Sequence, residues 1–384
     1  MKYPETISTK LPKVETSIFT VMSALAHQEK ALNLSQGFPD FEVDPQLISL
    51  VHENMLAGHN QYAPMAGAMA LREQMATITE ERFSLSYNPD NEITITAGAT
   101  QAIYSAITSL VKEGDEVIIF TPAYDCYQPA IELSGGKVIF MQLKPPYYGV
   151  DWEEFKRLIT RRTRMIIINT PHNPTGTVMS AEDMHKLEQI TRDKDIIVLS
   201  DEVYEHIVFD GYEHQSVARF PKLAERSIII GSFGKTFHTT GWKMGYVLAP
   251  SNITKEIRKV HQYTVFAANH PVQLALAEYL KTPEHYTGVS AMYEEKRNYF
   301  NKALEGSNFI VRPSAGTYFQ LLDYSKISEE KDTDFSIRLT KEYKIASIPI
   351  SVFYHAPDQN NVLRFCFAKS LETLDKAAEI LHKI

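Results

Sequence analysis

Four consecutive apolar residues, Met165-Ile166-Ile167-Ile168, form a run in which no polar residue alternates with an apolar one. Such a run is typical of a β-strand that is covered on both faces. Residues 196–199 and 227–230 have a similar character, and a segment with helical periodicity over 181–191 separates the first strand from the second. Buried strands separated by helices predict an α/β fold with a mostly parallel sheet.

The same alternation extends on both sides of this run, so we expect a sheet of the seven-stranded type with helices on both faces. Further strands are predicted at 92–96, 116–120, 137–142 and 246–249, and further helices at 46–57, 68–81, 101–111 and within 252–304. Shorter strands are predicted at 309–312, 317–322, 345–348 and 362–366, and helices at 18–25, 335–342 and 373–381. We therefore predict a large domain over 46–284 and a smaller α+β domain made of 1–45 together with 285–384.

The composition limits the classes of function. The 384 residues are 44% hydrophobic and 22% charged, which is typical of a soluble globular protein. A net charge of −8 argues against a general nucleic-acid binder and against an anionic membrane as partner. No run approaches the ~20 apolar residues of a membrane span, and the first 20 residues contain no apolar stretch of the signal-peptide type.

The two cysteines, Cys126 and Cys366, are too few for a disulfide framework and suit a reducing cytosol, so we expect a cytoplasmic protein. Neither Cys-x-x-Cys nor His-Glu-x-x-His spacing occurs in the chain. No metal site is therefore predicted.

Polar side chains follow five of the predicted strands at the point where each strand ends. Because ligands of open α/β sheets bind at the carboxyl ends of the strands, these side chains are candidates for one site. The segments are Gly98-Ala99-Thr100, Thr121-Pro122-Ala123-Tyr124, residues 169–176, Ser200-Asp201-Glu202-Val203-Tyr204, and the turn that carries Ser232 and Lys235. One edge of the sheet is expected to present a helix start, an aromatic ring, an amide, an acid with a phenol, and a lysine.

The start of the helix after strand 92–96 suits a phosphate, because backbone N–H groups and the helix dipole attract anions. Ala99, Thr100 and Gln101 are expected to supply the N–H donors. Ser232 and Lys243 can close on the same phosphate, one by a hydrogen bond and one by charge.

The remaining side chains suit an aromatic aldehyde. Tyr124 offers a flat face to a heteroaromatic ring, and a buried Asp201 needs a positive partner such as a protonated pyridine nitrogen. Asn173 and Tyr204 can donate to a phenolate oxygen, and Lys235 can form a Schiff base with an aldehyde. A phosphate, a ring, a pyridinium and an aldehyde together describe pyridoxal 5′-phosphate.

Each of these residues also has an ordinary structural explanation. Lys235 by itself is most simply a solvated surface lysine, Tyr124 a packing residue, and Asp201 a helix N-cap. Asn173-Pro174 by itself is more often a turn than a binding site. Their occurrence together at successive strand ends favours a binding site over coincidence.

Three motifs at these strand ends are specific in combination: Pro171-His172-Asn173-Pro174-Thr175-Gly176, Asp201-Glu202-Val203-Tyr204 and Ser232-Phe233-Gly234-Lys235. They resemble the class I/II aminotransferases of pyridoxal phosphate fold type I. Residues 33–41, 60–62, 124–127 and 363–369 make the likeness strongest to the branch of methionine aminotransferases, kynurenine aminotransferases and glutamine transaminase K. The resemblance covers nearly the whole chain.

The resemblance implies a role for each candidate. Lys235 would carry the cofactor as a Schiff base, Asp201 would face the pyridine nitrogen, and Tyr204 and Asn173 would contact the ring oxygen. The stacking ring would be Tyr124, and the phosphate would be held by Ala99, Thr100, Gln101, Ser232 and Lys243. Many relatives have Arg at the position of Lys243, and a lysine supplies the charge without the two-pronged geometry.

The resemblance also implies how substrate and partner subunit bind. Arg364 and Asn173 would hold the substrate α-carboxylate, with the Gly37 backbone nearby. Tyr62 would reach the phosphate of a neighbouring subunit, which implies a homodimer with shared active sites.

The expected reaction moves the amino group of an L-amino acid to a 2-oxo acid by a ping-pong mechanism. Phe19, Tyr62, Tyr124 and Phe353 are aromatic candidates for the substrate pocket, and no second arginine lies in a motif for a side-chain carboxylate. Methionine is therefore the first choice of donor, followed by aromatic amino acids, glutamine and kynurenine.

Three alternatives stay open. The same cofactor supports β-elimination, as in a cysteine-S-conjugate β-lyase. A nicotinamide-dependent Rossmann enzyme is the general α/β alternative, although no Gly-x-Gly-x-x-Gly follows an early strand. A non-catalytic effector-binding module would need a nucleic-acid-binding appendage or lack the lysine.

Overall fold

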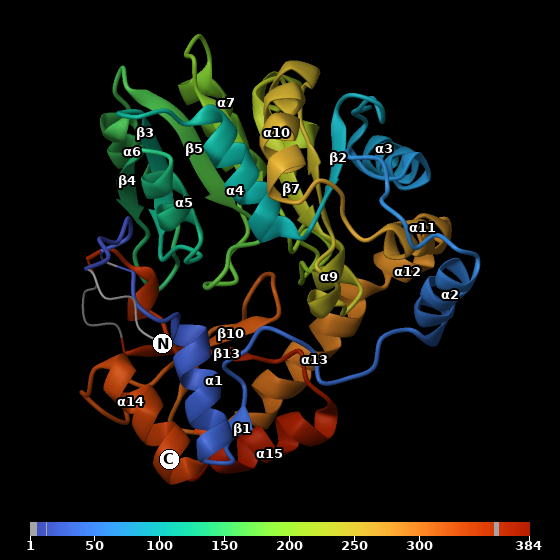
Figure 1. Ribbon diagram of the computed structural model, residues 1–384. Helices are drawn as coiled ribbons and strands as arrows, with labels where there is room; N and C mark the ends of the chain where they lie inside the picture. The colour runs from blue at the N-terminus through green and yellow to red at the C-terminus, as the bar shows by residue number, and fades with distance from the viewer. Residues whose placement is uncertain (1–5, 13, 357–360) are drawn as a thin grey trace.

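The computed structural model describes residues 6–12, 14–356 and 361–384. A seven-stranded sheet forms the upper part of the molecule in Figure 1, and the N-terminal and C-terminal segments lie together below it. The strand order is β2-β8-β7-β6-β5-β3-β4, in which β8 is antiparallel to both neighbours and the other pairs are parallel. This arrangement confirms the predicted mostly parallel α/β sheet.

The strands of this sheet are β2 (Ile93–Thr96), β3 (Glu116–Thr121), β4 (Lys137–Gln142), β5 (Thr163–Asn169), β6 (Ile197–Asp201), β7 (Ser227–Ser232) and β8 (Gly245–Leu248). Successive residues of β5 enter different cores. Ile166 and Ile168 pack on one face of the sheet, whereas Met165 and Ile167 pack on the other. An apolar run without alternation thus serves two buried faces, as its pattern predicts.

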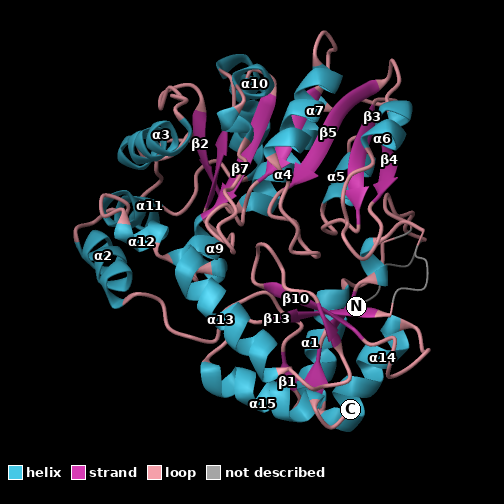
Figure 2. Cartoon of the chain, turned by 180° about the vertical axis from the view of Figure 1, so that it is seen from behind, coloured by secondary structure: helices cyan, strands magenta, loops and turns pink. Residues whose placement is uncertain are grey.

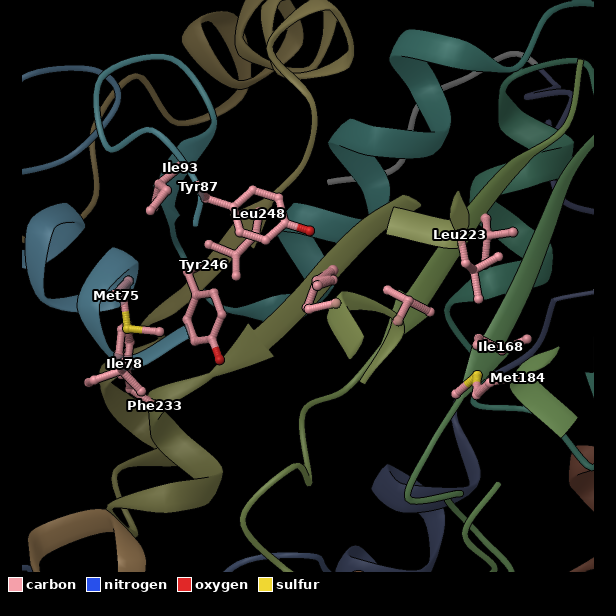
Figure 3. Packing of buried hydrophobic residues seen from close by; sticks show 14 of the residues in the cluster. Met75, Ile78, Tyr87, Ile93, Ile168, Met184, Leu223, Phe233, Tyr246 and Leu248 are labelled. Carbon is pink, nitrogen blue, oxygen red and sulfur yellow. The ribbon is translucent and has the colours of Figure 1, made fainter. Parts of the chain in front are cut away.

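Helices cover both faces of the sheet (Figure 2). One face packs against α4 (Ala99–Leu110), α5 (Tyr127–Leu133) and α10 (Ser251–Thr264). The opposite face packs against α3 (Met69–Phe83), α6 (Trp152–Leu158), α7 (Ala181–Thr191), α8 (Pro221–Ala224) and α11 (His270–Tyr279), with α2 (Pro45–Leu56) beyond α11. In this second core Phe233 packs on Tyr246 of β8, with ring centroids 5.2 Å apart (Figure 3).

The smaller part contains a four-stranded antiparallel sheet in the order β12 (Ile348–Pro349), β13 (Val362–Cys366), β10 (Phe319–Asp323) and β9 (Ile310–Val311). The helices here are α1 (Ile18–Gln28), α13 (Val289–Ala303), α14 (Asp332–Arg338) and α15 (Leu371–Leu381), whereas α12 (Glu284–Thr287) buries Tyr286 in the core of the large sheet. A parallel pair of β1 (Leu32–Asn33) with β11 (Ile345–Ala346) joins the N-terminal segment to the C-terminal one. The division at residues 45/46 and 284/285 stays a prediction.

Some elements differ from the expectation. Lys235 lies in a short helix, α9 (Phe233–Thr236), instead of a turn, because the Phe237 N–H donates to the Phe233 carbonyl at 2.8 Å. The helix expected over 101–111 begins at Ala99, since Gly98 supplies the left-handed backbone (φ 81°) that leads into it.

Two further segments divide where one element was expected. The predicted strand 345–348 is two short strands, because β11 pairs with β1 whereas β12 pairs with β13. The predicted helix 335–342 is α14 followed by a π-helical turn over Leu339–Tyr343. Short 3₁₀ turns occupy Val217–Arg219, Thr240–Trp242 and Ser351–Phe353.

Two features are absent from the described ranges. Every helix there is too short or too polar to cross a membrane. The same ranges contain no group of three or more His, Cys, Asp or Glu side chains that could hold a metal ion.

Candidate active site

A cavity of about 200 Å³ lies at the carboxyl ends of β5, β6 and β7. Twelve of the predicted site residues line it: Phe19, Gly37, Ala99, Thr100, Tyr124, Asn173, Asp201, Tyr204, Ser232, Lys235, Lys243 and Arg364. The sheet edge supplies most of them, and the smaller part supplies Phe19, Gly37 and Arg364. Residues that are far apart in the chain therefore face one space.

Lys235 is positioned by α9, which follows directly from β7. Its Nζ lies 2.8 Å from the Tyr318 hydroxyl and 3.4 Å from the Gly37 carbonyl oxygen. Burial lowers the pKa of Lys235 to about 8, and the positive charges of Arg364 and Lys243 act in the same direction. An amine with this pKa is available in its neutral, nucleophilic form near neutral pH.

Asp201 is the last residue of β6 and is buried. The Tyr127 hydroxyl donates to Asp201 Oδ2 at 2.5 Å, and the Val203 N–H donates to Oδ1 at 3.3 Å. Burial raises the pKa of Asp201 to about 6, and the hydrogen bond from Tyr127 opposes that rise. A carboxylate in this position is suited to a cationic ring nitrogen.

The start of α4 borders the cavity and has the backbone geometry that suits an anion. A Cβ atom on Gly98 would lie 3.5 Å from Lys243 Nζ, and one on Gly245 would lie 2.9 Å from the Ala99 backbone nitrogen. Gly245 thus allows β8 and the helix start to approach closely, whereas Gly98 is favoured by its positive φ of 81°. Lys243 itself adopts a left-handed backbone (φ 56°) that brings its side chain to this point.

Gln101 does not line the cavity with its side chain. Its Oε1 accepts from the Ala97 N–H at 3.1 Å, and its Nε2 donates to the Ser105 hydroxyl at 2.7 Å. Of the polar groups of Gln101, only the backbone N–H is thus available to donate to a phosphate, as expected.

Arg364 lies on β13 and is 1% exposed. Its Nη1 donates to Asn173 Oδ1 at 2.7 Å and its Nη2 to the Ser35 carbonyl at 3.1 Å. Nε has no hydrogen-bond partner among the described residues. Burial lowers the pKa of Arg364 to about 10, so the group remains cationic at neutral pH and suits a carboxylate ligand.

Aromatic rings surround this guanidinium. Arg364 Cζ lies 3.8 Å from the Phe319 ring centroid, 5.2 Å from that of Phe19 and 5.6 Å from that of Phe353. The rings of Phe19 and Phe353 are 5.8 Å apart. The space beside the carboxylate site is therefore aromatic.

Three functional candidates were missed in the sequence. Asn169 accepts from the Asn173 N–H at 2.8 Å and donates to the Asp201 carbonyl at 2.9 Å. The position of Asn169 at the end of β5 could have indicated a role in the site. Tyr127 and Tyr318 lie away from any strand end of the large sheet. No sequence pattern indicates that Tyr127 meets Asp201 or that Tyr318 meets Lys235.

Tyr62 lies outside the cavity of its own chain. Its side chain is 81% exposed and packs edge-on against Phe266, with ring centroids 5.3 Å apart. A role at the phosphate of a neighbouring subunit stays a prediction.

Residues 29–381 match the model of the family described as aminotransferase class I and II. This chain is a class I and II aminotransferase. The aminotransferase is 50% identical over 377 residues to the methionine aminotransferase of Escherichia coli K12, covering 98% of both chains. It is 31% identical to kynurenine–oxoglutarate transaminase 1 of Rattus norvegicus, covering 97% of both chains.

Solved structures agree with this assignment. The aminotransferase superimposes on YbdL of E. coli, a protein with a methionine aminotransferase function, with a TM-score of 0.97. The two chains are 50% identical, and the superposition covers 99% of this chain and 100% of the other. The N-succinyldiaminopimelate aminotransferase of Mycobacterium tuberculosis gives a TM-score of 0.95 at 35% identity, covering 98% and 100% of the two chains. The predicted enzyme class and fold type are confirmed, and the nicotinamide alternative is wrong.

The aminotransferase uses pyridoxal phosphate as its cofactor. The cavity fits this group: Lys235 has a lowered pKa, Asp201 is a buried carboxylate, and a helix start lies beside Lys243. The substrates are an amino acid and a 2-oxo acid.

Proposed function

We propose that this enzyme transfers the amino group of L-methionine to a 2-oxo acid, with aromatic amino acids, glutamine and kynurenine as further donors. The charge distribution of the cavity carries the proposal. Among the described residues that line it, the cations are Lys235, Lys243 and Arg364. We assign these to the cofactor aldehyde, its phosphate and the substrate α-carboxylate. No cation of this described lining remains for a second carboxylate, and aromatic rings occupy that place instead.

Similarity supports the same choice of substrate. A relative at 50% identity is a methionine aminotransferase, and more distant relatives are kynurenine–oxoglutarate transaminases. A thioether or an aromatic side chain gains from contact with aromatic rings such as those of Phe19 and Phe319, which line the cavity, whereas Phe353 packs behind Phe19 and does not line it. An acidic side chain gains nothing there and loses its hydration.

Pyridoxal phosphate, when bound, supplies an aldehyde for the amino group and a ring that withdraws electrons. In our assignment, the carboxylate of Asp201 keeps a proton on the ring nitrogen. Tyr204 and Asn173 donate to the ring oxygen, and Tyr124 stacks on the ring. The phosphate would be held by the N–H groups of Ala99, Thr100 and Gln101, by the Ser232 hydroxyl and by Lys243.

Arg364 and Asn173 orient the amino acid through its carboxylate, with the Gly37 backbone beside it. Lys235 Nζ, once it is free, takes the proton from the substrate α-carbon and is the general acid/base of the reaction. The 2-oxo acid formed from the donor leaves before the acceptor binds, so ping-pong kinetics follow.

We propose a homodimer in which Tyr62 completes the site of the neighbouring subunit. Tyr62 is 81% exposed and packs on Phe266, which is itself 42% exposed. An exposed apolar surface of this kind marks an interface. We also propose a cytoplasmic location, since Cys126 and Cys366 are both free thiols.

A half-reaction screen tests the donor. The holoenzyme is mixed with single amino acids, and the loss of the cofactor absorbance band is followed by stopped flow. Methionine is expected to react fastest, aromatic amino acids next, and aspartate at least about tenfold more slowly, because its side-chain carboxylate finds no partner. Aspartate reacting as fast as methionine contradicts the proposal. Pyruvate and ammonia released from a cysteine S-conjugate in the absence of a 2-oxo acid indicate β-elimination instead.

Reduction with borohydride tests the assignment of the lysine. The pyridoxyl group is expected on the peptide that contains Lys235, and Lys235→Ala is expected to lose about 10²-fold or more of the activity. Lys222→Ala is the control, because Lys222 is an exposed residue that pairs with Glu225. A label on another lysine contradicts the assignment.

A further inference from the structure

Tyr318 is a buried residue directly before β10, with an accessibility of 0%. Its ring packs edge-on against Tyr204, with ring centroids 5.2 Å apart, and against Phe319 at 4.9 Å. Tyr293 of α13 covers it from another side at 5.7 Å. The ring is therefore held in place, and so is its hydroxyl group.

The Tyr318 hydroxyl lies within hydrogen-bond distance of two groups. It donates its proton to the Gly37 carbonyl oxygen, so its own oxygen faces Lys235 as an acceptor. Lys235 Nζ lies 2.8 Å from that oxygen and 3.4 Å from the Gly37 carbonyl oxygen. The amine thus has two acceptors, one side chain and one backbone carbonyl.

This arrangement determines where the nitrogen lone pair points. A neutral lysine amine has two N–H donors and one lone pair. With one N–H directed at Tyr318 and the other at Gly37, the lone pair is directed away from both acceptors. A lone pair in that orientation is free to accept a proton from a molecule in the cavity.

The carboxylate site is adjacent in the chain. Phe319, the next residue, stacks on Arg364, and Arg364 Nη2 donates to the Ser35 carbonyl, two residues before Gly37. The strand start at 318–319 and the loop at 35–37 thus hold both the lysine amine and the guanidinium. The same two segments therefore contact both the proposed base and the guanidinium that we assign to the substrate carboxylate.

We propose that Tyr318, together with the Gly37 carbonyl, is a positioning residue that holds the free amine of Lys235 with its lone pair directed at the substrate α-carbon. The inference rests on the proposed role of Lys235. In the step concerned the C–H bond of the substrate breaks, an N–H bond forms on Lys235, and the electron pair stays on the carbon side. Tyr318 exchanges no proton in this step. Without it, the flexible four-carbon stem of the lysine leaves the amine unoriented.

Tyr318→Phe tests the proposal, because it removes the hydroxyl and keeps the packed ring. Tyr293→Phe is the matched control: this tyrosine is equally buried and packs on Tyr318, but its hydroxyl lies 3.0 Å from His238 Nδ1 instead of bonding to Lys235. Half-reactions are followed by stopped flow with ordinary and α-deuterated methionine. In Tyr318→Phe we expect a rate about 10- to 100-fold lower, a larger isotope effect and an unchanged KM. In Tyr293→Phe we expect no change.

A second readout does not depend on turnover. The full-length apoenzyme is labelled competitively with acetic anhydride across a pH series, and the Lys235 peptide is quantified by mass spectrometry. Loss of an acceptor destabilises the ammonium form, so Tyr318→Phe is expected to shift the labelling midpoint of Lys235 to lower pH. Tyr293→Phe is expected to leave the midpoint in place.

The outcomes separate this inference from the proposed function. If borohydride places the pyridoxyl group on Lys235 but both variants behave alike, Tyr318 has no positioning role and the role of Lys235 stands. If the group is found on another lysine, the proposed function itself fails.

Should Tyr318→Phe not fold, a fluorinated tyrosine at 318 keeps the shape and weakens the acceptor. A rate that does not fall with fluorination then overturns the proposal.

Discussion

Lys235 and Asp201 show how burial favours the neutral form of a basic and of an acidic side chain. The same desolvation lowers the pKa of Lys235 to about 8 and raises that of Asp201 to about 6. The neutral amine of Lys235 is the form that reacts with an aldehyde. The carboxylate of Asp201 would be stabilised by a cationic ring nitrogen. Their chemistry therefore depends on the packing around them as much as on their residue type.

The pKa of Lys235 predicts a pH dependence. The rate at which apoenzyme captures pyridoxal phosphate should rise with pH and level off above about 8, because the neutral amine becomes dominant there. Stopped-flow absorbance across pH 6–10 measures this rate, with buffer effects checked at two ionic strengths. A rate that keeps rising to pH 10 indicates an ordinary lysine pKa of about 10.4.

Arg364→Lys tests the carboxylate site. A lysine keeps the charge but cannot donate to Asn173, Ser35 and a substrate carboxylate in a fixed plane. We expect kcat/KM for methionine to fall about 10- to 100-fold, chiefly through KM. Arg338→Lys, at a surface pair with Glu330, is the control and should change neither constant. An unchanged KM in Arg364→Lys assigns the carboxylate to another group.

At the scale of elements, the site depends on contacts between segments that pack side by side. Tyr127 at the start of α5 reaches across to Asp201 at the end of β6. Gly245 of β8 lets the start of α4 approach to within van der Waals distance. Strand order, not sequence distance, brings these pairs together.

Tyr127→Phe tests the contact between α5 and β6. The ionised form of Asp201 loses a donor, so the free energy of unfolding should fall by about 1.5–3 kcal/mol at pH 8. The folded-state pKa of Asp201 is raised to about 6, so below pH 6 the carboxyl is protonated and the loss should shrink. Urea unfolding of the apoenzyme at pH 5 and pH 8 measures the difference. An equal loss at both pH values contradicts a bond to the ionised form.

At the scale of the whole molecule, one cavity is built from both parts of the chain. Phe19, Gly37 and Arg364 come from the smaller part, and the cofactor residues come from the sheet edge. The neighbouring subunit is expected to add Tyr62. In our proposal the cavity of one chain would hold the cofactor ring, and Tyr62 of a neighbouring subunit would complete the phosphate site.

A hybrid dimer tests the shared site. Lys235→Ala and Tyr62→Ala are each expected to have low activity alone. After mixing by unfolding and refolding, half of the dimers contain one site in which both residues are intact, so about a quarter of the wild-type activity should return. Subunits that are mixed without exchange serve as the control. No recovery in verified hybrid dimers contradicts sharing of Tyr62.

The sequence by itself determined the class of fold and most of the site. Runs such as 165–168 are typical of strands buried on both faces, and polar residues that follow parallel strands are expected at one edge of the sheet. Tertiary structure decided the rest. Contacts between distant segments decide three features of the site. They decide that the Gln101 side chain bonds to its own helix, that Tyr127 bonds to Asp201, and that the Tyr318 hydroxyl bonds to Lys235. Local residue patterns carry no record of those contacts, because they arise only when strands and helices pack.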